Sequence, residues 1–419
     1  MTATRWHVDQ LCDDVAVLSR RGLPREQFFA ELADRLRRVL RCDASCWHTL
    51  DPQTRLITSD AGQELVSSGV YTPQALQAAS AAIVASEYFT GDVNTFASLS
   101  ARRVPVSILS QATKGRPERS ARYNAVLAPA GIPFELRAAF VSRGRAWGAV
   151  HLARRGSSGD FTAQDATALA AVTTAIADGL RTTLRLDAAR AAGPAGGPGM
   201  VLLGPGDEIE MITPPARELL ASMRPRGSSE QAPPTAVLAL AAFARASAGL
   251  ARHNTDAVVV PTSSGWITLH AALPEGAANG RVAIVLERAV SGASAAVRLE
   301  AHGATPRERE IATLLARGLT NPEIAAALVL SPYTVQDHIK NLFEKTSVAS
   351  RQELVARIFL DDYLPGLARR TPLTANGGLA YPEAASNAPS RWPGQGTKPG
   401  TGAAGVRRVA SGSAAAGEP

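Results

Sequence analysis

The side chains with the clearest chemical pattern lie between residues 331 and 345, where polar groups recur on one side of an expected helix. Placing Val335 at the origin and advancing about 100° per residue brings Ile339 and Leu342 to the same side, which we expect to be buried. The other sides collect hydrogen-bonding groups, namely Tyr333, Thr334, Gln336, Asp337, His338, Lys340, Asn341 and Glu344. Such a face suits the donors and acceptors exposed in the major groove of DNA.

Four short helices, each with its own start signal, are expected to position this face. Thr305 is an N-cap residue followed by Pro306, and Glu308 completes a capping box. Gly318 stands where a helix end favours a left-handed residue. The later helices are expected to begin at Thr320 or Asn321, at Ser331 and at Ser350. Capped helices joined by such short turns predict a compact helix-turn-helix bundle.

The segment resembles the LuxR-type (NarL/FixJ-like) DNA-binding domain of bacterial transcription regulators. The resemblance is carried without a gap by Thr305–Glu310, Gly318, Thr320–Asn321, Glu323–Ala325, Ser331, Thr334–Val335, His338, Asn341, Lys345, Ser350–Arg351 and Glu353–Leu354. It implies that double-stranded DNA is bound through Ser331, Tyr333, Thr334, Gln336, Asp337, His338, Lys340, Asn341 and Lys345. It also implies a homodimer formed through the last helix, with Leu354, Val355 and Ile358 as contact residues.

Charge and three departures from the family pattern leave the target open. Gln336 stands where the family often has lysine, Asp337 is an acid on the expected DNA face, and Ala312 replaces a larger aliphatic residue. Residues 305–362 carry seven Lys and Arg against eight Asp and Glu, so net charge gives no support for DNA binding. The alternative is a protein-interaction module, in which a sigma-factor-like bundle engages the transcription machinery.

Length and composition exclude several other classes. A chain of 419 residues with 45% hydrophobic residues has room for two to four domains. The net charge of +7 is concentrated in part in residues 363–419, and the three cysteines include no CxxC pair, as in a reducing cytoplasm. The seven histidines lack metal-ligand spacing, and no catalytic motif is present. We therefore expect no enzyme activity, no metal, no cofactor and no membrane span.

Residues 15–186 are expected to form a sensor domain. The pattern predicts a helix over Trp6–Leu40, strands near residues 45–58, a hairpin pairing Glu135–Val141 with Ala146–Leu152, and a long helix capped by Thr162. This order resembles a GAF-type domain, which implies a pocket for a small-molecule ligand. Residues that could line this pocket are Trp47, Tyr71, Tyr88, Phe140 and Trp147.

The rest of the chain divides by composition. Residues 187–199 form a linker, residues 200–289 resemble a PAS-like α+β domain with Trp266 and His270 as candidate ligand contacts, residues 290–303 form a second linker, and residues 364–419 are expected to be disordered. The fold class is thus multidomain, with α+β GAF/PAS-like sensor domains ahead of an all-α four-helix helix-turn-helix domain at 304–363. We expect a cytoplasmic one-component transcription regulator, with RNA polymerase as a further candidate partner.

Overall fold

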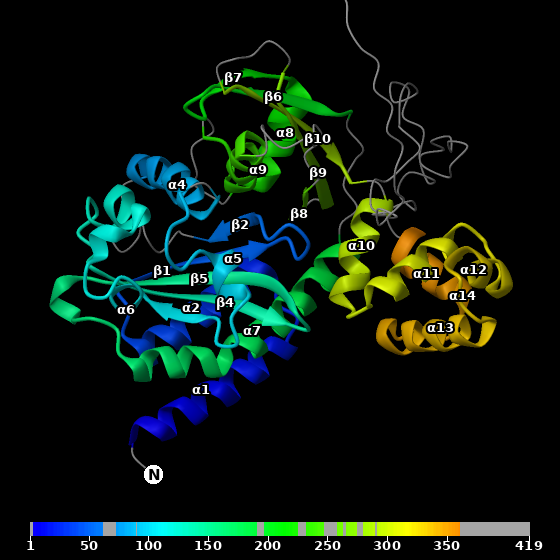
Figure 1. Ribbon diagram of the computed structural model, residues 1–419, viewed down its shortest axis with the longest axis horizontal. Coiled ribbons are helices and arrows are strands. Elements are labelled where there is room, and N and C mark those ends of the chain that lie inside the picture. The colour runs from blue at the N-terminus through cyan, green and yellow to red at the C-terminus, as the bar shows by residue number, and fades with distance from the viewer. Residues whose placement is uncertain are drawn as a thin grey trace, which may run out of the picture. The chain divides into compact units, whose positions relative to one another are not determined.

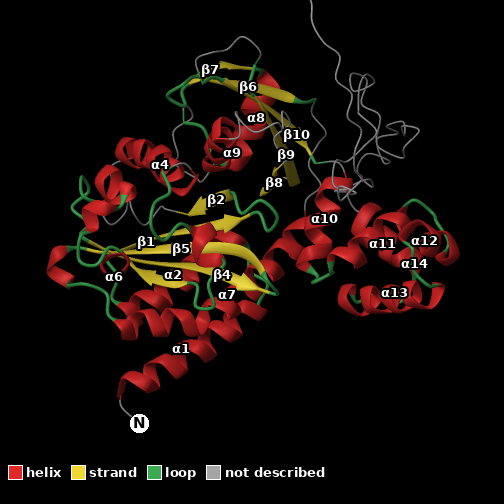
Figure 2. Cartoon of the chain, in the orientation of Figure 1, coloured by secondary structure: helices red, strands yellow, loops and turns green. Residues whose placement is uncertain are grey.

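The computed structural model describes residues 3–61, 73–88, 90–190, 197–224, 232–246, 258–262, 265–274, 280–289 and 291–360. Within these ranges the chain forms two five-stranded antiparallel sheets, each accompanied by helices, and then a group of helices (Figures 1 and 2). The coarse prediction of α+β regions ahead of a helical C-terminal region is therefore confirmed. Tyr71 and the tail at 364–419 lie outside the described residues.

The first sheet has the strand order β2 (Ile57–Ala61), β1 (Ala44–Leu50), β5 (Arg145–Arg154), β4 (Phe134–Ser142) and β3 (Val106–Ile108). The predicted hairpin is confirmed as β4 and β5, which are joined through the Ser142–Arg145 pair. Arg143 and Gly144 between them have φ of 52° and 73°. Positive φ at both positions gives the tight turn whose twist matches that of two antiparallel strands.

Three helices cover one face of this sheet: α1 (Ala3–Arg20), α2 (Arg25–Leu40) and α7 (Ala163–Arg190). The stretch Trp6–Leu40 is helical as expected, but it is divided into two helices because the chain breaks between α1 and α2. Gly22 has a φ of 62°, and a Cβ atom there would lie 2.4 Å from Leu186 Cδ1. The break thus requires a glycine, both for its backbone conformation and for its close approach to α7.

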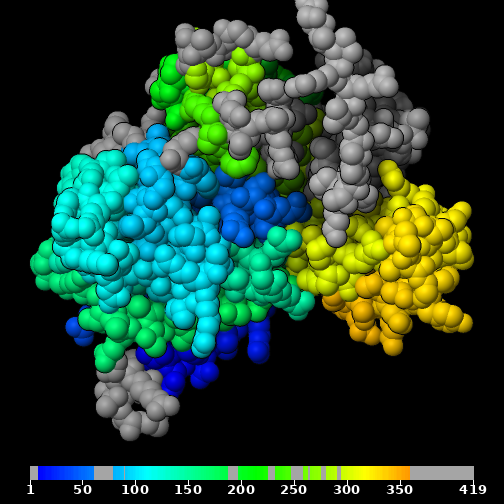
Figure 3. All heavy atoms as spheres, in the orientation of Figure 1, coloured from blue at the N-terminus to red at the C-terminus, as the bar shows by residue number. Residues whose placement is uncertain are grey.

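The opposite face of the sheet is covered by shorter segments. They are α4 (Pro73–Tyr88), α5 (Phe96–Ser100), α6 (Leu109–Ala112), the 3₁₀ turn Pro117–Arg119 and the wider helical turn Tyr123–Leu127; a further 3₁₀ turn, Gly156–Ser158, follows β5. In the space-filling view their atoms, light blue to cyan, hide most of the strands behind them (Figure 3). Apart from α4, the segments that cover this face are short, so few regular helices pack against it.

The second sheet has the order β7 (Ile209–Ile212), β6 (Gly199–Leu203), β10 (Val282–Arg288), β9 (Gly265–Ala272) and β8 (Val258–Thr262). Two helices accompany it, α8 (Pro214–Met223) and α9 (Thr235–Ala246). One side of α9 packs on this sheet through Val237 and Leu240, whereas Leu238 and Ala242 join an apolar cluster with Ile57 of β2. Because α9 is apolar on all sides, it can be buried on all sides.

The C-terminal helices are α10 (Ser291–Ala301), α11 (Pro306–Ala316), α12 (Asn321–Leu328), α13 (Pro332–Thr346) and α14 (Arg351–Val355), and a last helical turn spans Ala356–Leu360. The expected linker at 290–303 is therefore wrong for most of its length. Leu299 of α10 packs with the helices that follow, whereas Val297 and Ala301 pack with the interior of the first sheet region. Because α10 has apolar side chains on two of its sides, the helix can bury them against both regions at once.

Candidate functional site

Side-chain caps set the start of each helix around α13. Thr305 Oγ1 accepts a hydrogen bond from the Glu308 backbone N–H at 3.3 Å, and the Glu308 carboxylate accepts one from the Thr305 N–H at 2.7 Å. Ser331 Oγ accepts from the Thr334 N–H at 3.0 Å, and Ser350 Oγ accepts from the Glu353 N–H at 3.1 Å. The predicted start signals are confirmed, because each cap satisfies an N–H that has no partner within its helix.

The inner side of α13 is apolar, as the spacing predicted. Val335 and Leu342 are fully buried and Ile339 is 9% exposed. They belong to one cluster with Ala295, Leu299, Ala304, Ile311, Ala312, Leu315, Ile324, Ala325, Val348, Leu354 and Ile358. Gly318, with φ of 89°, ends the turn after α11. The cluster fixes the rotation of α13 and therefore decides which of its side chains face solvent.

The outer side of α13 is polar and open. Its exposed side chains are Tyr333, Gln336, Asp337, Lys340, Asn341 and Glu344, and those of Thr334 and His338 are half-buried. Ser331, the cap residue, is also exposed. Lys340 is the exposed cation of this face, and within the described part of the chain it forms no ion pair. Figure 1 shows α13 beside α11, α12 and α14, and the hydrogen-bonding groups lie on the side of α13 away from the apolar cluster.

Lys345, also expected to bind DNA, lies differently. Its Nζ atom is 2.6 Å and 2.8 Å from the two carboxylate oxygens of Glu308, which is 2% exposed. Burial by itself would raise the pKa of Glu308, but the hydrogen bonds from Lys345 and Thr305 and the Lys345 charge outweigh it and lower that pKa. The Lys345 charge is therefore used inside the domain, where it ties the end of α13 to the start of α11.

The turn between α12 and α13 holds a strained residue. Val329 follows α12 with φ of 54° and ψ of 52°, in the left-handed region. The next residue closes the turn, because the Leu330 N–H donates to Ala325 O at 2.9 Å. Left-handed backbone costs an L-residue about 1–2 kcal/mol, and a β-branched side chain adds to the crowding. Val329 is nevertheless 92% exposed, so its side chain gains nothing from packing.

The last helix differs from the expected dimer surface. Leu354 and Ile358 are fully buried in the cluster under α13, and only Val355 of the three expected contact residues keeps some exposed surface. Arg298 of α10 closes this end by donating to Ile358 O at 3.1 Å and to Arg357 O. Two of the three side chains are thus needed for the fold of the domain itself.

A second polar concentration lies on the first sheet, on the face away from α1, α2 and α7. The register pairs Arg137 of β4 with His151 of β5, and Cys46 of β1 lies on the other side of His151. His48 and Glu135 have the same alternation and share this face. All four polar side chains, those of His48, Glu135, Arg137 and His151, are at least nine-tenths buried. A sheet face with so many buried charges requires partners for them.

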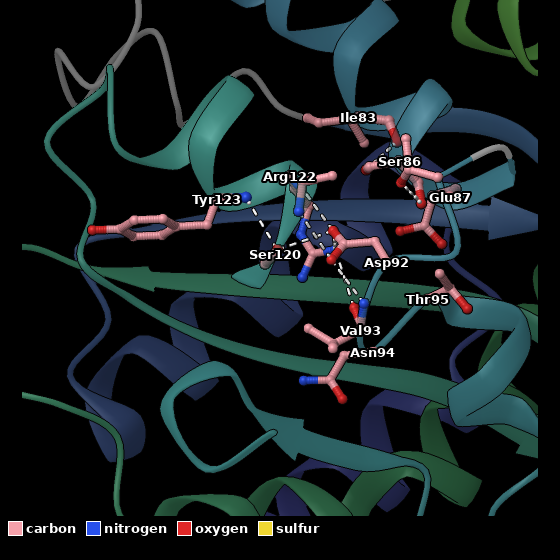
Figure 4. A network of polar contacts seen from close by, with 12 residues as sticks. Ile83, Ser86, Glu87, Asp92, Val93, Asn94, Thr95, Ser120, Arg122 and Tyr123 are labelled. Atoms are coloured by element: carbon pink, nitrogen blue, oxygen red, sulfur yellow. Dashed lines mark hydrogen bonds and ion pairs between the residues drawn. The ribbon is translucent and has the colours of Figure 1, made fainter. Parts of the chain in front are cut away.

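Arg122 provides the central partner. Its guanidinium donates to both Glu135 carboxylate oxygens, at 2.7 Å and 3.1 Å, and to Asp92 Oδ2 at 3.0 Å. Asp92 also accepts from Ser120 Oγ at 2.9 Å (Figure 4). Burial by itself would raise the pKa of Glu135, but the Arg122 and Arg137 charges and the hydrogen bonds from His151 and Arg122 lower it well below its usual range. The Glu135 carboxylate is therefore held ionised.

Some groups on this face have no hydrogen-bond partner among the described residues. They are the side-chain amide of Asn94, Nδ1 of His48 and Nε2 of His151. Asn94 is 2% exposed, and its side chain is turned away from the Arg122–Asp92 contacts in Figure 4. Burial, followed by the nearby His151 and Arg137, lowers the pKa of His48 far below 6.5, so this imidazole is neutral. The unpartnered groups can therefore offer both donors and acceptors.

Sequence reasoning missed this polar face and chose aromatic residues instead. Trp47, Phe140 and Trp147 lie in the apolar cluster with α1, α2 and α7. Tyr88 lies on the same side of the sheet as the polar face, where its hydroxyl accepts a hydrogen bond from the Ile57 N–H at 2.9 Å. The usable signal was the alternation of Glu135, Arg137 and His151 within otherwise apolar strands.

The candidate contacts in the second sheet region are separated. Trp266 is buried with the first sheet's apolar cluster, whereas His270 is exposed and lies 3.3 Å from Glu287. Among the described residues, no group of three His, Cys, Asp or Glu side chains is placed to hold a metal ion. No described helix is both long enough and apolar enough to cross a membrane.

Comparison with known proteins concerns the C-terminal helices. Residues 304–358 match the family described as bacterial regulatory proteins, luxR family. The chain is 51% identical over 55 residues to the transcriptional regulatory protein UhpA of Escherichia coli, covering 13% of this chain and 28% of UhpA. It is 42% identical over 77 residues to the tetrathionate response regulatory protein TtrR of Salmonella typhimurium, covering 17% and 37%.

A third relative is a putative HTH-type transcriptional regulator of Mycobacterium bovis, which is 45% identical over 51 residues. These residues are 12% of this chain and 6% of that protein. The chain thus spans well under half the length of the curated relatives it matches, and the shared part is a small fraction of its own length. The likeness identifies residues 304–358 as a luxR-family helix-turn-helix.

Proposed function

We propose that the chain is a DNA-binding transcriptional regulator that reads the major groove with α13. The observation that carries the proposal is the division of α13 into a buried apolar side and an open polar side, within a segment that matches a family of regulators. Gln336, Asp337 and Lys340 are assigned to base edges, and Ser331, Thr334, His338 and Asn341 to the flanks of the groove. Lys345 acts through Glu308 instead of touching DNA.

The proposal includes binding as a homodimer, which would place two α13 helices at half-sites about one helical turn apart. With Leu354 and Ile358 buried, Val355 is the one of the three predicted contact residues that can contribute to such a contact without unfolding the domain. RNA polymerase is proposed as the second partner. We assign the protein to the cytoplasm and give it no catalytic role.

We further propose that residues 15–186 and 200–289 are GAF-like and PAS-like sensing domains. Support comes from the two five-stranded antiparallel sheets. In the first, Asn94, His48 and His151 present unpartnered polar atoms on one buried face, which is the proposed place for a small polar ligand. Binding there would shift the population of the DNA-binding arrangement.

The test of DNA binding uses the full chain and fragments of the host genome, selected at two salt concentrations. We expect recurring fragments that share a two-fold-related site and whose affinity falls with salt. Binding that is independent of sequence, or no binding, would contradict the proposal. Co-purification with polymerase in the absence of a DNA footprint would support the interaction module instead.

The test of sensing measures the affinity of the protein for its operator DNA in the presence of fractionated small molecules from the host. We expect at least one fraction to change the affinity of the wild-type chain but not that of Asn94→Ala. Asn124→Ala, which alters an exposed asparagine on the same side of the sheet, is the matched control and should respond as wild type does. If no fraction changes the affinity of any of the three proteins, the sensing proposal is wrong.

A further inference from the structure

Two apolar side chains stand open to solvent at the helix-turn-helix turn. Val329, directly after α12, is 92% exposed, and Tyr333, in the first turn of α13, is 82% exposed. Among the described residues they are the most exposed of the large hydrophobic side chains; the next, Val17, is 63% exposed. They are four residues apart in the sequence, at the turn that leads into the N-terminal end of α13.

The left-handed backbone of Val329 closes the end of α12, because its N–H and that of Leu330 both donate to Ala325 O. Eight non-glycine residues in the described ranges have positive φ, and Val329 is the β-branched one among them. Glycine or asparagine would adopt this backbone at lower cost. The isopropyl group, being exposed to water, gives no stability from burial in return. The hydrogen bonds at this turn need only the backbone, so a benefit from the valine side chain itself would have to come from a bound partner.

Tyr333 belongs to the same face as the residues assigned to base edges. By helical geometry it lies within about 40° of Asp337, Lys340 and Glu344 around the axis of α13. Its ring therefore extends this face toward the N-terminal end of the helix, where helix-turn-helix proteins approach the bases. Asp337 and Glu344, the two acids on this face, disfavour close contact with DNA phosphates. We therefore look for an apolar partner for the Tyr333 ring at this end of the helix.

We propose that Val329 and Tyr333 form an apolar contact for the C5-methyl group of thymine. The inference rests on the proposed function, and it adds a preference for thymine at one position of the DNA sequence that is bound. The thymine methyl is the apolar group that base pairs present in the major groove. A thymine is therefore expected in each half-site at the position met by the N-terminal end of α13, next to the base pairs read by Gln336 and Asp337.

The test replaces thymine by uracil, one position at a time, in a duplex that the full chain selects from genomic fragments. Uracil keeps the base pair and removes only the methyl group. We expect one position per half-site at which the replacement weakens wild-type binding about fourfold, the value for one buried CH₂-sized group. Val329→Gly and Tyr333→Ala should bind the thymine duplex more weakly and should lose the difference between thymine and uracil.

Three further variants separate a contact role from a structural one. Val329→Gly should raise Tm by a few degrees while lowering affinity, because it relieves the left-handed strain. Tyr333→Phe keeps the ring and should keep the methyl preference. Val104→Gly changes another exposed valine, in a loop of the first sheet region, and should leave affinity unchanged.

The outcomes are distinguishable. If the wild-type chain selects no duplex, the proposed function fails, and this inference fails with it. If it selects a duplex but every uracil replacement is neutral and both variants retain wild-type affinity, only the inference is overturned, and a protein partner becomes the assignment for the pair. If Val329→Gly lowers Tm and affinity together, the residue is structural and the inference is also overturned.

Discussion

At the residue scale, two lysines of one helix have different surroundings. Lys340 is exposed on α13 and forms no ion pair within the described residues, whereas Lys345 is bound to the buried carboxylate of Glu308. The difference arises because Glu308 lies on α11 and reaches Lys345 only when the helices pack. A free surface charge can release counterions from DNA, but a charge neutralised inside the domain cannot.

We therefore expect Lys340→Ala to weaken operator binding and to reduce the slope of log affinity against log salt concentration by up to about 0.9, the value for one neutralised DNA charge. Its Tm should stay near that of wild type, since no ion pair is lost. Lys345→Ala is the matched control with the same change in charge, and it should lower Tm. Titrations of both variants over a salt series check this, and an unchanged slope for Lys340→Ala would mean that α13 meets DNA with another face.

His302 gives the molecule a dependence on pH. Its Nδ1 lies 3.2 Å from Lys345 O. Burial, followed by the positive charges of Arg185, Arg357 and Arg298, lowers the His302 pKa from 6.5 to about 4, although its hydrogen bond to Lys345 opposes the shift. The unfolded chain therefore takes up a proton near pH 6.5 and the folded chain only near pH 4. Folding stability must fall as the pH drops through this window and level off below it.

The expected contribution of His302 to this loss is about 3 kcal/mol between pH 7 and pH 4. His302→Gln cannot take up the proton, so its free energy of unfolding should fall less over the same range. Urea unfolding of both proteins at several pH values measures the difference. Parallel pH profiles for the two proteins would show that His302 is not the titrating group.

At the element scale, α11 is held by one carboxylate with two tasks. Glu308 caps the helix through the Thr305 N–H and pairs with Lys345, and it is almost completely buried. A lost cap alone costs about 1 kcal/mol, and removal of one partner of a buried ion pair costs more. The short helices of the C-terminal region depend on such contacts because their own propensity is not sufficient.

Glu308→Ala is therefore expected to destabilise the DNA-binding helices by about 2–4 kcal/mol. Glu310→Ala on the same helix is the control, since Glu310 is exposed and, among the described residues, pairs with Arg307 alone, at 2.7 Å; its effect should stay within about 0.5 kcal/mol. Hydrogen exchange of the α11 amides reports on both. Equal protection in the two variants would contradict the assigned role of Glu308.

At the scale of the whole molecule, α10 takes part in two interiors. Glu300, 4% exposed, lies 2.5 Å from Arg145 Nε at the start of β5 and 3.1 Å from the Arg309 guanidinium on α11. Arg181 of α7 donates to Ala301 O at 2.7 Å. A buried carboxylate shared by two arginines connects segments that are far apart in the sequence, so these contacts can transmit a change from the first sheet to the helices.

Glu300→Gln removes the charge while keeping the size of the side chain. We expect faster hydrogen exchange in α10 and α11 and a lower Tm, because Arg145 and Arg309 lose the buried carboxylate that they share. Glu344→Gln, an exposed substitution on α13, should leave exchange in α10 unchanged. If Glu300→Gln leaves both Tm and α10 exchange as in wild type, Glu300 does not connect the two regions.

The helix-turn-helix could be predicted from the sequence because its signals are local. Caps at Thr305, Ser331 and Ser350, the glycine at position 318 and the helical spacing of Val335, Ile339 and Leu342 each act within a few residues along the chain. The hairpin of β4 and β5 follows from its Arg-Gly turn for the same reason. These features determined which helix carries the polar face, and so the function that we propose.

Only the tertiary structure decided which polar groups are free. Arg122, Asp92 and Glu135 come together across long stretches of chain, so their pairing depends on strand register and on the segments that cover the sheet. The engagement of Lys345 by Glu308 has the same origin. The burial of Leu354 and Ile358 and the helical state of residues 291–301 also depend on packing between distant segments. Sequence spacing reports neighbours along one element, whereas the availability of a charge or an apolar side chain is set by what folds against it.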